Sequence, residues 1–535
     1  MNKSAMPLEE IFSACHKFLS PEIWSQLVLE LDGDDQWASL PGIIRSRSDE
    51  LTLPHYLEEL ADLEASIQSC REIGGQLPFQ VDQKCLNPSL HILKFNWQGL
   101  LNALDLAVGR DFAPVAGAET LLVWFDPQKG RVRTLPATDN NLLALKITAE
   151  KLPIGPTALE NGVAVANLHR VVEQARKQGL ILVPETLLVR DPERFIPREK
   201  VFERFLKPRV FTLQWHITQA CDLSCKHCYD RSSRRPISLE QAFQVLDELE
   251  SFCDLRQVRG KVTFTGGNPL LYPHFDALYL ETVKRGFPVS ILGNPTSRQR
   301  LEELIAIQAP SFYQVSLEGL PEHNDFVRQA GYFNRVMEFL PILKDLGIFS
   351  QVMLTLTRDN MAQVLPLGEI LRDRTDIFTF NRLSAVGEGA RLLMPKPADY
   401  QAFLREYMDE VSSNPVLGLK DNLINIIRDE KGRKPFGGCT GYGCGAGFNF
   451  VTLLSDGEIH ACRKFPSYLG NIYQEGLCGA YDSPAGQRYR AGSAACRGCK
   501  LLPACGGCQA VIYSLGLDPS KDRDPYCFYS QPPQQ

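Results

Sequence analysis

Cysteine is the residue type through which this chain can do its most distinctive chemistry. Of sixteen cysteines, eleven lie in two short-spaced groups, one near residue 225 and one from 439 to 527. The N-terminus turns acidic at Glu9 and Glu10, where a signal peptide would turn apolar, so we expect a cytoplasmic protein. In a reducing compartment, grouped thiols indicate metal binding and not disulfides. The remaining five are scattered, and we interpret them as incidental thiols: Cys15, Cys70, Cys85, Cys253 and Cys478.

The first group consists of Cys221, Cys225 and Cys228 on one short loop. Three such thiolates can bind three irons of a four-iron cluster and leave the fourth iron without a protein ligand. A small molecule with an amine and a carboxylate can chelate that open iron. An electron passed to a sulfonium bound there breaks its carbon–sulfur bond and releases a primary radical. The alternative is a zinc site that His227 or a distant ligand completes.

The second group contains eight thiols, the number that two fully ligated four-iron clusters require. A zinc ribbon built from the last two short pairs would use only four of them. Residues 391–535 are rich in Gly, Cys and short turns, so metal would have to hold this segment together. The eight are Cys439, Cys444, Cys462, Cys496, Cys499, Cys505, Cys508 and Cys527.

Alternating strand and helix patterns between residues 210 and 385 must position the first group. Repeated strand–helix units predict a parallel sheet with right-handed crossovers. Six units are too few for a closed eight-unit barrel, so we expect an α/β fold with a partial (β/α)6 TIM-like barrel, in which chemistry gathers at the C-terminal strand ends. The predicted strands are 211–217, 261–265, 288–292, 312–317, 351–356 and 377–380.

The N-terminal third divides into two parts in our interpretation. Residues 1–117 are expected to form a helical region. Residues 118–200 begin with a predicted hairpin, strands 120–125 and 131–135, followed by helices at 141–151 and 163–178, a helix stop at Gly179 and a strand at 180–183. This order is similar to winged-helix modules that bind precursor peptides, and a structural winged helix without a ligand is the alternative. Residues 205–390 and 391–535 complete a four-domain prediction.

Composition excludes several function classes. The 535 residues are 44% apolar and 22% charged, as in soluble globular proteins, and the length alone predicts two or three domains. The net charge of -6, with no sustained basic run, argues against a nucleic-acid partner. No apolar stretch approaches the roughly 20 residues that cross a bilayer, so no membrane association is expected.

The three-cysteine loop resembles that of the radical S-adenosylmethionine (radical SAM) superfamily, whose signature has three and then two residues between cysteines. The resemblance extends over about residues 210–390. That family usually has an aromatic residue before the last cysteine, and His227 stands there as an implied cofactor contact. It also carries a Gly-Gly-Glu-Pro turn that receives the methionine amino group. Here the turn is Gly266, Gly267, Asn268 and Pro269, so the side-chain oxygen is kept and the charge is lost.

The segment that contains Ser316 and Arg328 is similar to another motif of the same family. The resemblance implies that Ser316 and Arg328 contact the carboxylate or ribose of the cofactor. An arginine fork suits a carboxylate. The alternative for Arg328 is a surface salt bridge.

The eight C-terminal cysteines resemble the SPASM extension of radical enzymes that modify peptides and proteins. The resemblance implies that Cys439, Cys444, Cys462 and Cys508 hold one auxiliary cluster, and that Cys496, Cys499, Cys505 and Cys527 hold the other. The last pair of that pattern normally has three residues between its cysteines, whereas Cys505 and Cys508 have two. Sulfatase-maturating enzymes place an aspartate base after the cysteine equivalent to Cys462. Arg463 stands there and cannot accept a proton, which disfavours sulfatase maturation.

These resemblances imply a peptide maturase. The length of this chain and its long N-terminal extension resemble those of the maturases of the selenobiotic peptide family. Such an enzyme would cleave S-adenosylmethionine to a 5′-deoxyadenosyl radical, use three [4Fe–4S] clusters and a reductant such as flavodoxin or ferredoxin, and modify a ribosomally made precursor peptide by a thioether or related cross-link. The alternatives are modification of a small molecule or whole protein, and a non-catalytic iron–sulfur scaffold. The sequence identifies no general base.

Overall fold

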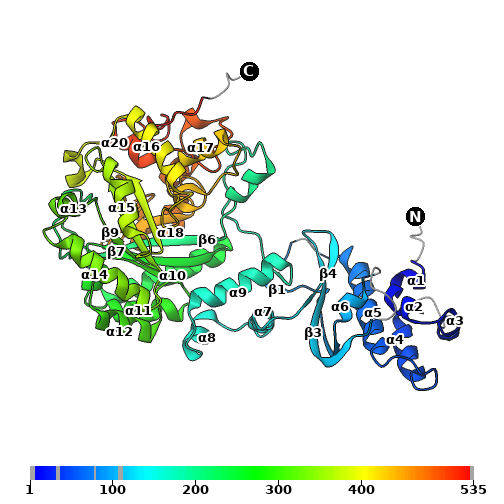
Figure 1. Cartoon of the computed structure of the whole chain (residues 1–535). Coiled ribbons are helices and arrows are strands. Elements are labelled where there is room, and N and C mark those ends of the chain that lie inside the picture. Colours follow the sequence, from blue (N-terminus) through cyan, green and yellow to red (C-terminus); the bar gives the residue numbers. More distant parts are fainter. Residues whose placement is uncertain (1–5, 32–35, 78–79, 106–111, 531–535) are drawn as a thin grey trace. The chain divides into compact units, whose positions relative to one another are not determined.

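The computed structural model describes residues 6–31, 36–77, 80–105 and 112–530. The chain forms two compact units, both drawn in Figure 1. Unit 1 contains residues 1–153 and 167–185, and unit 2 contains residues 154–166 and 186–535. Among the described helices, none is both long and apolar enough to span a bilayer.

Unit 1 packs a helical cluster against a small antiparallel sheet. The helices are α1 (Leu8–Ile11), α2 (Ser13–Phe18), α3 (Pro21–Leu29), α4 (Gln36–Arg47), α5 (Leu57–Gly74) and α6 (Leu100–Ala103). The sheet order is β2 (His91–Gln98), β3 (Val115–Asp126) and β4 (Arg131–Pro136). The predicted hairpin is therefore confirmed, as β3 and β4.

Strand β2 lies in the region that we expected to be helical. Its apolar residues Leu93, Phe95 and Trp97 alternate with polar ones, which is the period of a strand with one buried face. Because β2 pairs with β3, residues 91–98 extend the hairpin into a three-stranded sheet. That alternation was the signal that could have found the strand.

The two predicted helices after the hairpin are present as α7 (Asp139–Ala149) and α9 (Val165–Gln178), with α8 (Ile154–Glu160) between them. Helix α7 begins at a capping box in which Thr138 and Asn141 exchange hydrogen bonds. After α9, Gly179 has φ 84°, the left-handed conformation expected of a glycine that ends a helix. The following strand β5 (Ile181–Leu182) pairs with β1 (Cys85–Leu86).

Unit 2 is built on a mostly parallel sheet with helices. Its first six strands lie side by side in chain order, all parallel, and each overlaps a predicted strand. They are β6 (Val210–Thr218), β7 (Arg259–Gly266), β8 (Val289–Leu292), β9 (Tyr313–Ser316), β10 (Ser350–Leu356) and β11 (Ile377–Arg382). The helices between them are α10 (Leu239–Arg256), α11 (Phe275–Lys284), α12 (Arg298–Ile307), α13 (Pro321–Val327), α14 (Tyr332–Asp345) and α15 (Val364–Leu371). A capping box of Ser238 and Gln241 opens α10.

The cysteine-rich segment adds three strands to this sheet. Strand β12 (Phe450–Leu453) pairs in parallel with β6, and β13 (Glu458–His460) and β14 (Tyr468–Asn471) follow antiparallel. This pairing was not predicted from the sequence, because glycines and cysteines interrupt the apolar pattern there. The remaining helices are α16 (Pro397–Glu410), α17 (Ile424–Glu430), α18 (Ile472–Asp482), α19 (Pro484–Ala491) and α20 (Gln509–Ser514).

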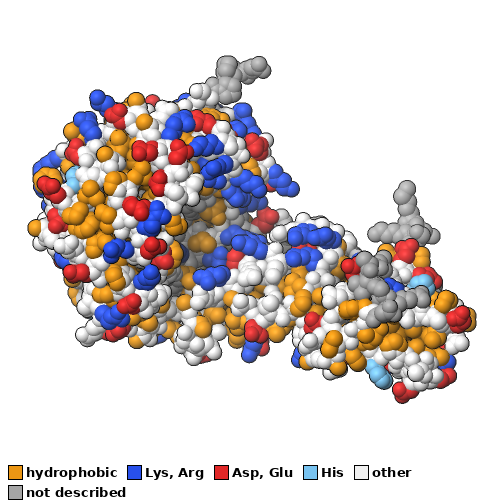
Figure 2. Space-filling model, viewed as in Figure 1, with side chains coloured by type: hydrophobic (Ala, Val, Ile, Leu, Met, Phe, Trp, Pro, Cys, Tyr) orange, Lys and Arg blue, Asp and Glu red, His pale blue; other side chains and the backbone are white. Residues whose placement is uncertain are grey.

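In the face shown in Figure 2, acidic and basic side chains are interspersed with apolar ones.

Candidate active site

A cavity of about 440 Å³ opens where the parallel strands of unit 2 end. The three-cysteine loop follows β6, the glycine turn follows β7, and Ser316 ends β9, so the C-terminal strand ends bring separate motifs to one place. Asn268 and Pro269 belong to the same turn but do not line the cavity. The predicted site residues that line the cavity are Cys221, Cys225, His227, Cys228, Gly266, Gly267, Ser316 and Arg328.

The glycine pair lets the turn after β7 approach the backbone of the cysteine loop. The amide of Gly267 donates to the carbonyl of Thr218 at 2.8 Å, and that of Asn268 donates to the carbonyl of Ala220 at 2.7 Å. A Cβ at Gly266, where φ is +136°, would lie 2.3 Å from the Thr218 carbonyl oxygen, and one at Gly267 would lie 2.2 Å from that of Ala220. A side chain is therefore excluded at both positions.

Asn268 is buried and holds Asp222, a residue that the sequence analysis did not single out. Its Nδ2 donates to Asp222 Oδ1 at 3.1 Å, and Asn294 Nδ2 donates to the same oxygen at 2.6 Å. Arg335 donates to Oδ2 at 3.3 Å. Burial opposes ionisation of Asp222, but hydrogen bonds from Asn294 and Asn268 outweigh it and lower the pKa of the carboxyl group.

Arg328 forms a buried salt bridge and not the surface one considered as its alternative. Its Nη2 donates to Glu318 Oε1 at 2.6 Å, and the two side chains are 10% and 2% exposed. Arg328 Nη1 lies 3.8 Å from Cys225 Sγ, and His227 Nε2 lies 3.4 Å from Glu318 Oε1. Burial opposes ionisation of Glu318, yet His227 and Arg328 together lower its pKa. The pair therefore places a guanidinium, with its charge balanced by Glu318, beside the cysteine loop.

Four further polar residues of the wall were not among the predicted site residues. His216 lies in β6, and its Nε2 is 3.2 Å from the hydroxyl of Tyr229. Burial lowers the pKa of His216 to about 3, so its imidazole is neutral at pH 7. Arg463 and Lys464 reach the same cavity from the SPASM-like segment. The available signal was a polar side chain at the end of a buried strand, and for the basic pair its place directly after Cys462.

The eight C-terminal cysteines gather as two sets of four. Cys439, Cys444, Cys462 and Cys508 line one small cavity, which buried Arg382 and Lys464 also line. Cys496, Cys499, Cys505 and Cys527 line another. Both are the sets that the SPASM resemblance implies. In the described part of the chain, no three His, Cys, Asp or Glu side chains converge closely enough for a single metal ion. A four-iron cluster spreads its thiolates over four corners and fits four cysteines around a cavity.

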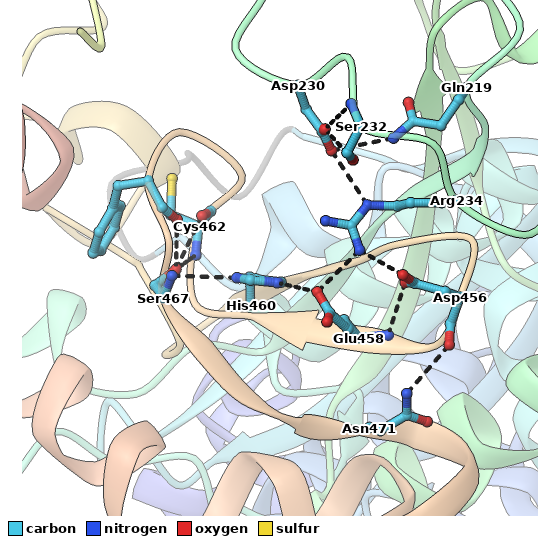
Figure 3. Close-up of polar contacts among 11 residues, drawn as sticks. Gln219, Asp230, Ser232, Arg234, Asp456, Glu458, His460, Cys462, Ser467 and Asn471 are labelled. Carbon is cyan, nitrogen blue, oxygen red and sulfur yellow. Dashed lines mark hydrogen bonds and ion pairs between the residues drawn. The ribbon is translucent and has the colours of Figure 1, made fainter. Parts of the chain in front are cut away.

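A chain of polar contacts joins the loop after Cys228 to Cys462 (Figure 3). Asp230 Oδ2 lies 3.5 Å from Arg234 Nε, and Arg234 Nη1 lies 3.0 Å from Glu458 Oε2. His460 Nε2 is 3.2 Å from the same Glu458 oxygen, while His460 Nδ1 accepts from the amide of Ser467 at 3.2 Å. The hydroxyl of Ser467 in turn accepts from the amide of Cys462 at 3.1 Å. The two cysteine-bearing segments are thus fixed relative to each other.

Comparisons with known proteins agree with this geometry. The radical SAM superfamily matches residues 215–369, and the SPASM iron–sulfur cluster-binding domain matches residues 444–509. The chain is 26% identical to the antilisterial bacteriocin subtilosin biosynthesis protein AlbA of Bacillus subtilis over 59% of this chain and 69% of AlbA. It is 27% identical to the mycofactocin maturase MftC of Mycolicibacterium smegmatis, over 61% and 84%, and 24% identical to an AdoMet-dependent heme synthase of Methanosarcina barkeri, over 60% and 97%.

Among solved structures, Streptococcus suis SuiB bound to S-adenosylmethionine superposes with a TM-score of 0.48 at 17% identity, over 77% of this chain and 96% of SuiB. The matched segment 215–369 contains the cysteine loop, the glycine turn and Arg328, and the matched segment 444–509 contains most of the two sets of four cysteines. The chain is therefore an enzyme of the radical SAM superfamily that carries a SPASM iron–sulfur cluster-binding domain.

Proposed function

We propose that this enzyme cleaves S-adenosylmethionine reductively to a 5′-deoxyadenosyl radical and uses the radical to modify a ribosomally synthesised precursor peptide. One observation carries the proposal: Cys221, Cys225 and Cys228 face a cavity large enough for a cofactor and part of a substrate. Similarity to AlbA and MftC, a bacteriocin biosynthesis protein and a maturase, supports a peptide substrate.

Residues of this chain would bind the cofactor as follows. A [4Fe–4S] cluster on the three cysteines, when bound, supplies the electron for carbon–sulfur cleavage. The backbone of Gly266 and Gly267, with Asn268 and Pro269 behind it, would receive the methionine amino group. Ser316 would contact the carboxylate or ribose. Arg328 and His227 would complete the wall beside the cluster, where Nη1 of Arg328 lies 3.8 Å from Cys225 Sγ.

The SPASM segment would hold two auxiliary [4Fe–4S] clusters, which makes three in the whole enzyme. The two sets of four cysteines would ligate them, and they would accept an electron or bind substrate. Lys464 lines both the main cavity and the cavity of Cys439, which supports a role for that auxiliary cluster near the reaction. A flavodoxin or ferredoxin would supply electrons in the cytoplasm.

Our proposal keeps four domains at 1–117, 118–200, 205–390 and 391–535. The hairpin β3–β4 followed by α7 and α9 supports a winged-helix-type module that would bind the precursor peptide. The six consecutive parallel strands support a partial barrel for residues 205–390. We further propose a selenobiotic-type peptide as substrate and a thioether or related cross-link as product.

A small-molecule substrate is the second candidate. The similarity to an AdoMet-dependent heme synthase, which extends over 97% of that protein, favours it. A 440 Å³ cavity has the size of a small-molecule site as well as of a peptide segment.

The test uses the full-length enzyme, reconstituted anaerobically and reduced with dithionite. With S-adenosylmethionine and a short Cys-rich peptide chosen from the reading frames that neighbour its gene, we expect 5′-deoxyadenosine and a changed peptide mass. Replacing all three cysteines of the loop by alanine should abolish both, whereas Cys478→Ala, outside the two groups, should abolish neither. Continued cofactor cleavage with an unchanged peptide mass would contradict the peptide substrate. Colourless protein that carries zinc would contradict the cluster.

A further inference from the structure

Arg463 carries a positive charge in the cavity wall, and no carboxylate of the described residues pairs with it. Its Nη1 donates to the hydroxyl of Thr265 at 3.4 Å, a long hydrogen bond, and its guanidinium lies 5.7 Å from the ring centre of Tyr229. No carboxylate of the described residues lies within ion-pair distance of it. A guanidinium has five N–H donors in a planar fork, so most of its hydrogen-bonding capacity faces no protein acceptor.

The other charged groups of the wall are already engaged. Arg328 is paired with Glu318, and Arg231 donates to the backbone carbonyl of Cys225 at 2.6 Å. Lys464 Nζ donates to the carbonyl of Arg382 at 3.2 Å and adds a second cation beside Arg463.

Asp230 is the one acidic residue among the described residues that line the cavity, and both oxygens of its carboxylate already have partners. Gln219 Nε2 donates to its Oδ2 at 3.1 Å, Ser232 donates to its Oδ1, and Arg234 lies 3.5 Å away (Figure 3). Asp230 therefore does not serve as the counter-charge of Arg463.

The backbone that carries Arg463 is held in place. The amide of the preceding residue, Cys462, donates to the Ser467 hydroxyl at 3.1 Å, and that hydroxyl donates back to the carbonyl of Cys462 at 3.0 Å. His460 fixes the amide of Ser467 from the other side (Figure 3). The turn therefore fixes the point from which the Arg463 side chain enters the cavity, so that a ligand would have to order only the side chain itself.

We propose that Arg463 binds a carboxylate of the substrate, so that the peptide segment in the cavity is anionic. The planar fork of arginine matches a carboxylate with two parallel hydrogen bonds. The carboxylate would come from an Asp or Glu side chain near the modified residue or from the C-terminus of the peptide. This inference rests on the proposed peptide substrate and names its charge.

The test combines enzyme variants with peptide variants. Arg463→Gln and Arg463→Lys are compared with the parent enzyme, and Arg391→Gln, a side chain that is 81% exposed, is the matched loss of an arginine elsewhere in unit 2. The probes are the precursor peptide encoded beside the gene, the same peptide with a C-terminal amide, and the same peptide with Asn and Gln for Asp and Glu in its core. Dissociation constants are measured by calorimetry on the anaerobic, S-adenosylmethionine-loaded enzyme, alongside 5′-deoxyadenosine formation and peptide mass.

We expect Arg463→Gln to weaken binding of the unaltered peptide on the order of 10- to 100-fold, the cost of losing a charged hydrogen-bonded contact. Arg463→Lys should retain part of the affinity, and Arg391→Gln all of it. One of the two altered peptides should bind the parent enzyme as weakly as the unaltered peptide binds Arg463→Gln, which identifies the source of the carboxylate. The affinity of that altered peptide for Arg463→Gln should be little lower than its affinity for the parent enzyme.

Two results would overturn the inference alone: equal peptide affinity in Arg463→Gln and the parent, or a loss confined to S-adenosylmethionine affinity, which would make Arg463 a cofactor contact. A parent enzyme that binds none of the three peptides would overturn both the inference and the proposed function. A parent that binds them all but changes no peptide mass would overturn the proposed function.

Discussion

The buried pair of Arg328 and Glu318 offers a sharp test of how the site is held together. Glu318 Oε1 accepts from Arg328 Nε at 3.0 Å and from Nη2 at 2.6 Å, and Oε2 accepts from the amide of Thr355 at 2.8 Å. Glu318→Gln keeps the shape and the bond from Thr355 but leaves the buried guanidinium without a counter-charge. Breaking a buried pair from one side typically costs about 3–5 kcal/mol. Because Gln keeps one oxygen acceptor, we expect a loss near the lower end, about 3 kcal/mol.

The double variant makes this prediction specific. Removing both charges typically costs much less than removing one, because no unpaired charge stays buried. Glu318→Gln combined with Arg328→Gln should therefore be more stable than Glu318→Gln alone. We would measure denaturant midpoints of the full-length reconstituted enzyme under anaerobic conditions. Glu369→Gln, which removes an exposed partner of Arg372, is the control and should leave the midpoint unchanged. Additive losses in the double variant would refute the buried-charge reasoning.

Three further predictions concern the same cavity. Asn268→Glu puts a second carboxylate where Nδ2 now lies 3.1 Å from Asp222 Oδ1. At an effective dielectric constant of about 20, the repulsion between the two carboxylates reaches about 5 kcal/mol before relaxation. The stability of the variant should therefore fall in denaturant titrations, and adding Asp222→Asn should restore most of it. Gly267→Ala drives a Cβ to 2.2 Å from the Ala220 carbonyl oxygen, displaces the cysteine loop, and should lower iron content measured by colorimetric assay. His216→Gln should make the stability less dependent on pH in acid. In the parent enzyme the imidazole protonates near pH 6.5 when the chain is unfolded but only near pH 3 when it is folded. The unfolded state therefore binds about one proton more in that interval, and stability falls as the pH drops through it, a contribution that the variant lacks.

Matched controls separate these effects from general damage. Gly75→Ala adds a Cβ that meets nothing within 4 Å, so iron content should be unchanged. His274→Gln removes an exposed imidazole and should leave the acid slope as it is. Unchanged iron in Gly267→Ala, or an unchanged acid slope in His216→Gln, would contradict the close approach or the burial from which each prediction was derived. An Asn268→Glu variant as stable as the parent would contradict the expected repulsion between two ionised carboxylates, for example because Asp222 becomes protonated.

The parts that could be predicted from the sequence are those governed by local patterns. The spacing of Cys221, Cys225 and Cys228 is a property of one loop, so its capacity for three irons follows without a fold. The six parallel strands were recoverable because each is a short apolar run between helix signals. The capping box of Ser238 and the stop at Gly179 depend on neighbours three or four residues away.

Tertiary structure decided the rest, because burial and long-range pairing have no local signature. Strand β12 joins β6 across the chain, and this pairing brings Arg463 from the cysteine-rich segment into a cavity built by the parallel sheet. Glu318 becomes the partner of Arg328, and Asp222 becomes the acceptor of two amides, only once loops from different strands meet. Spacing showed which residues could bind iron. The charge that the cavity presents to a substrate depends instead on the fold, which places Arg463 in the wall with no carboxylate of the described residues paired to it.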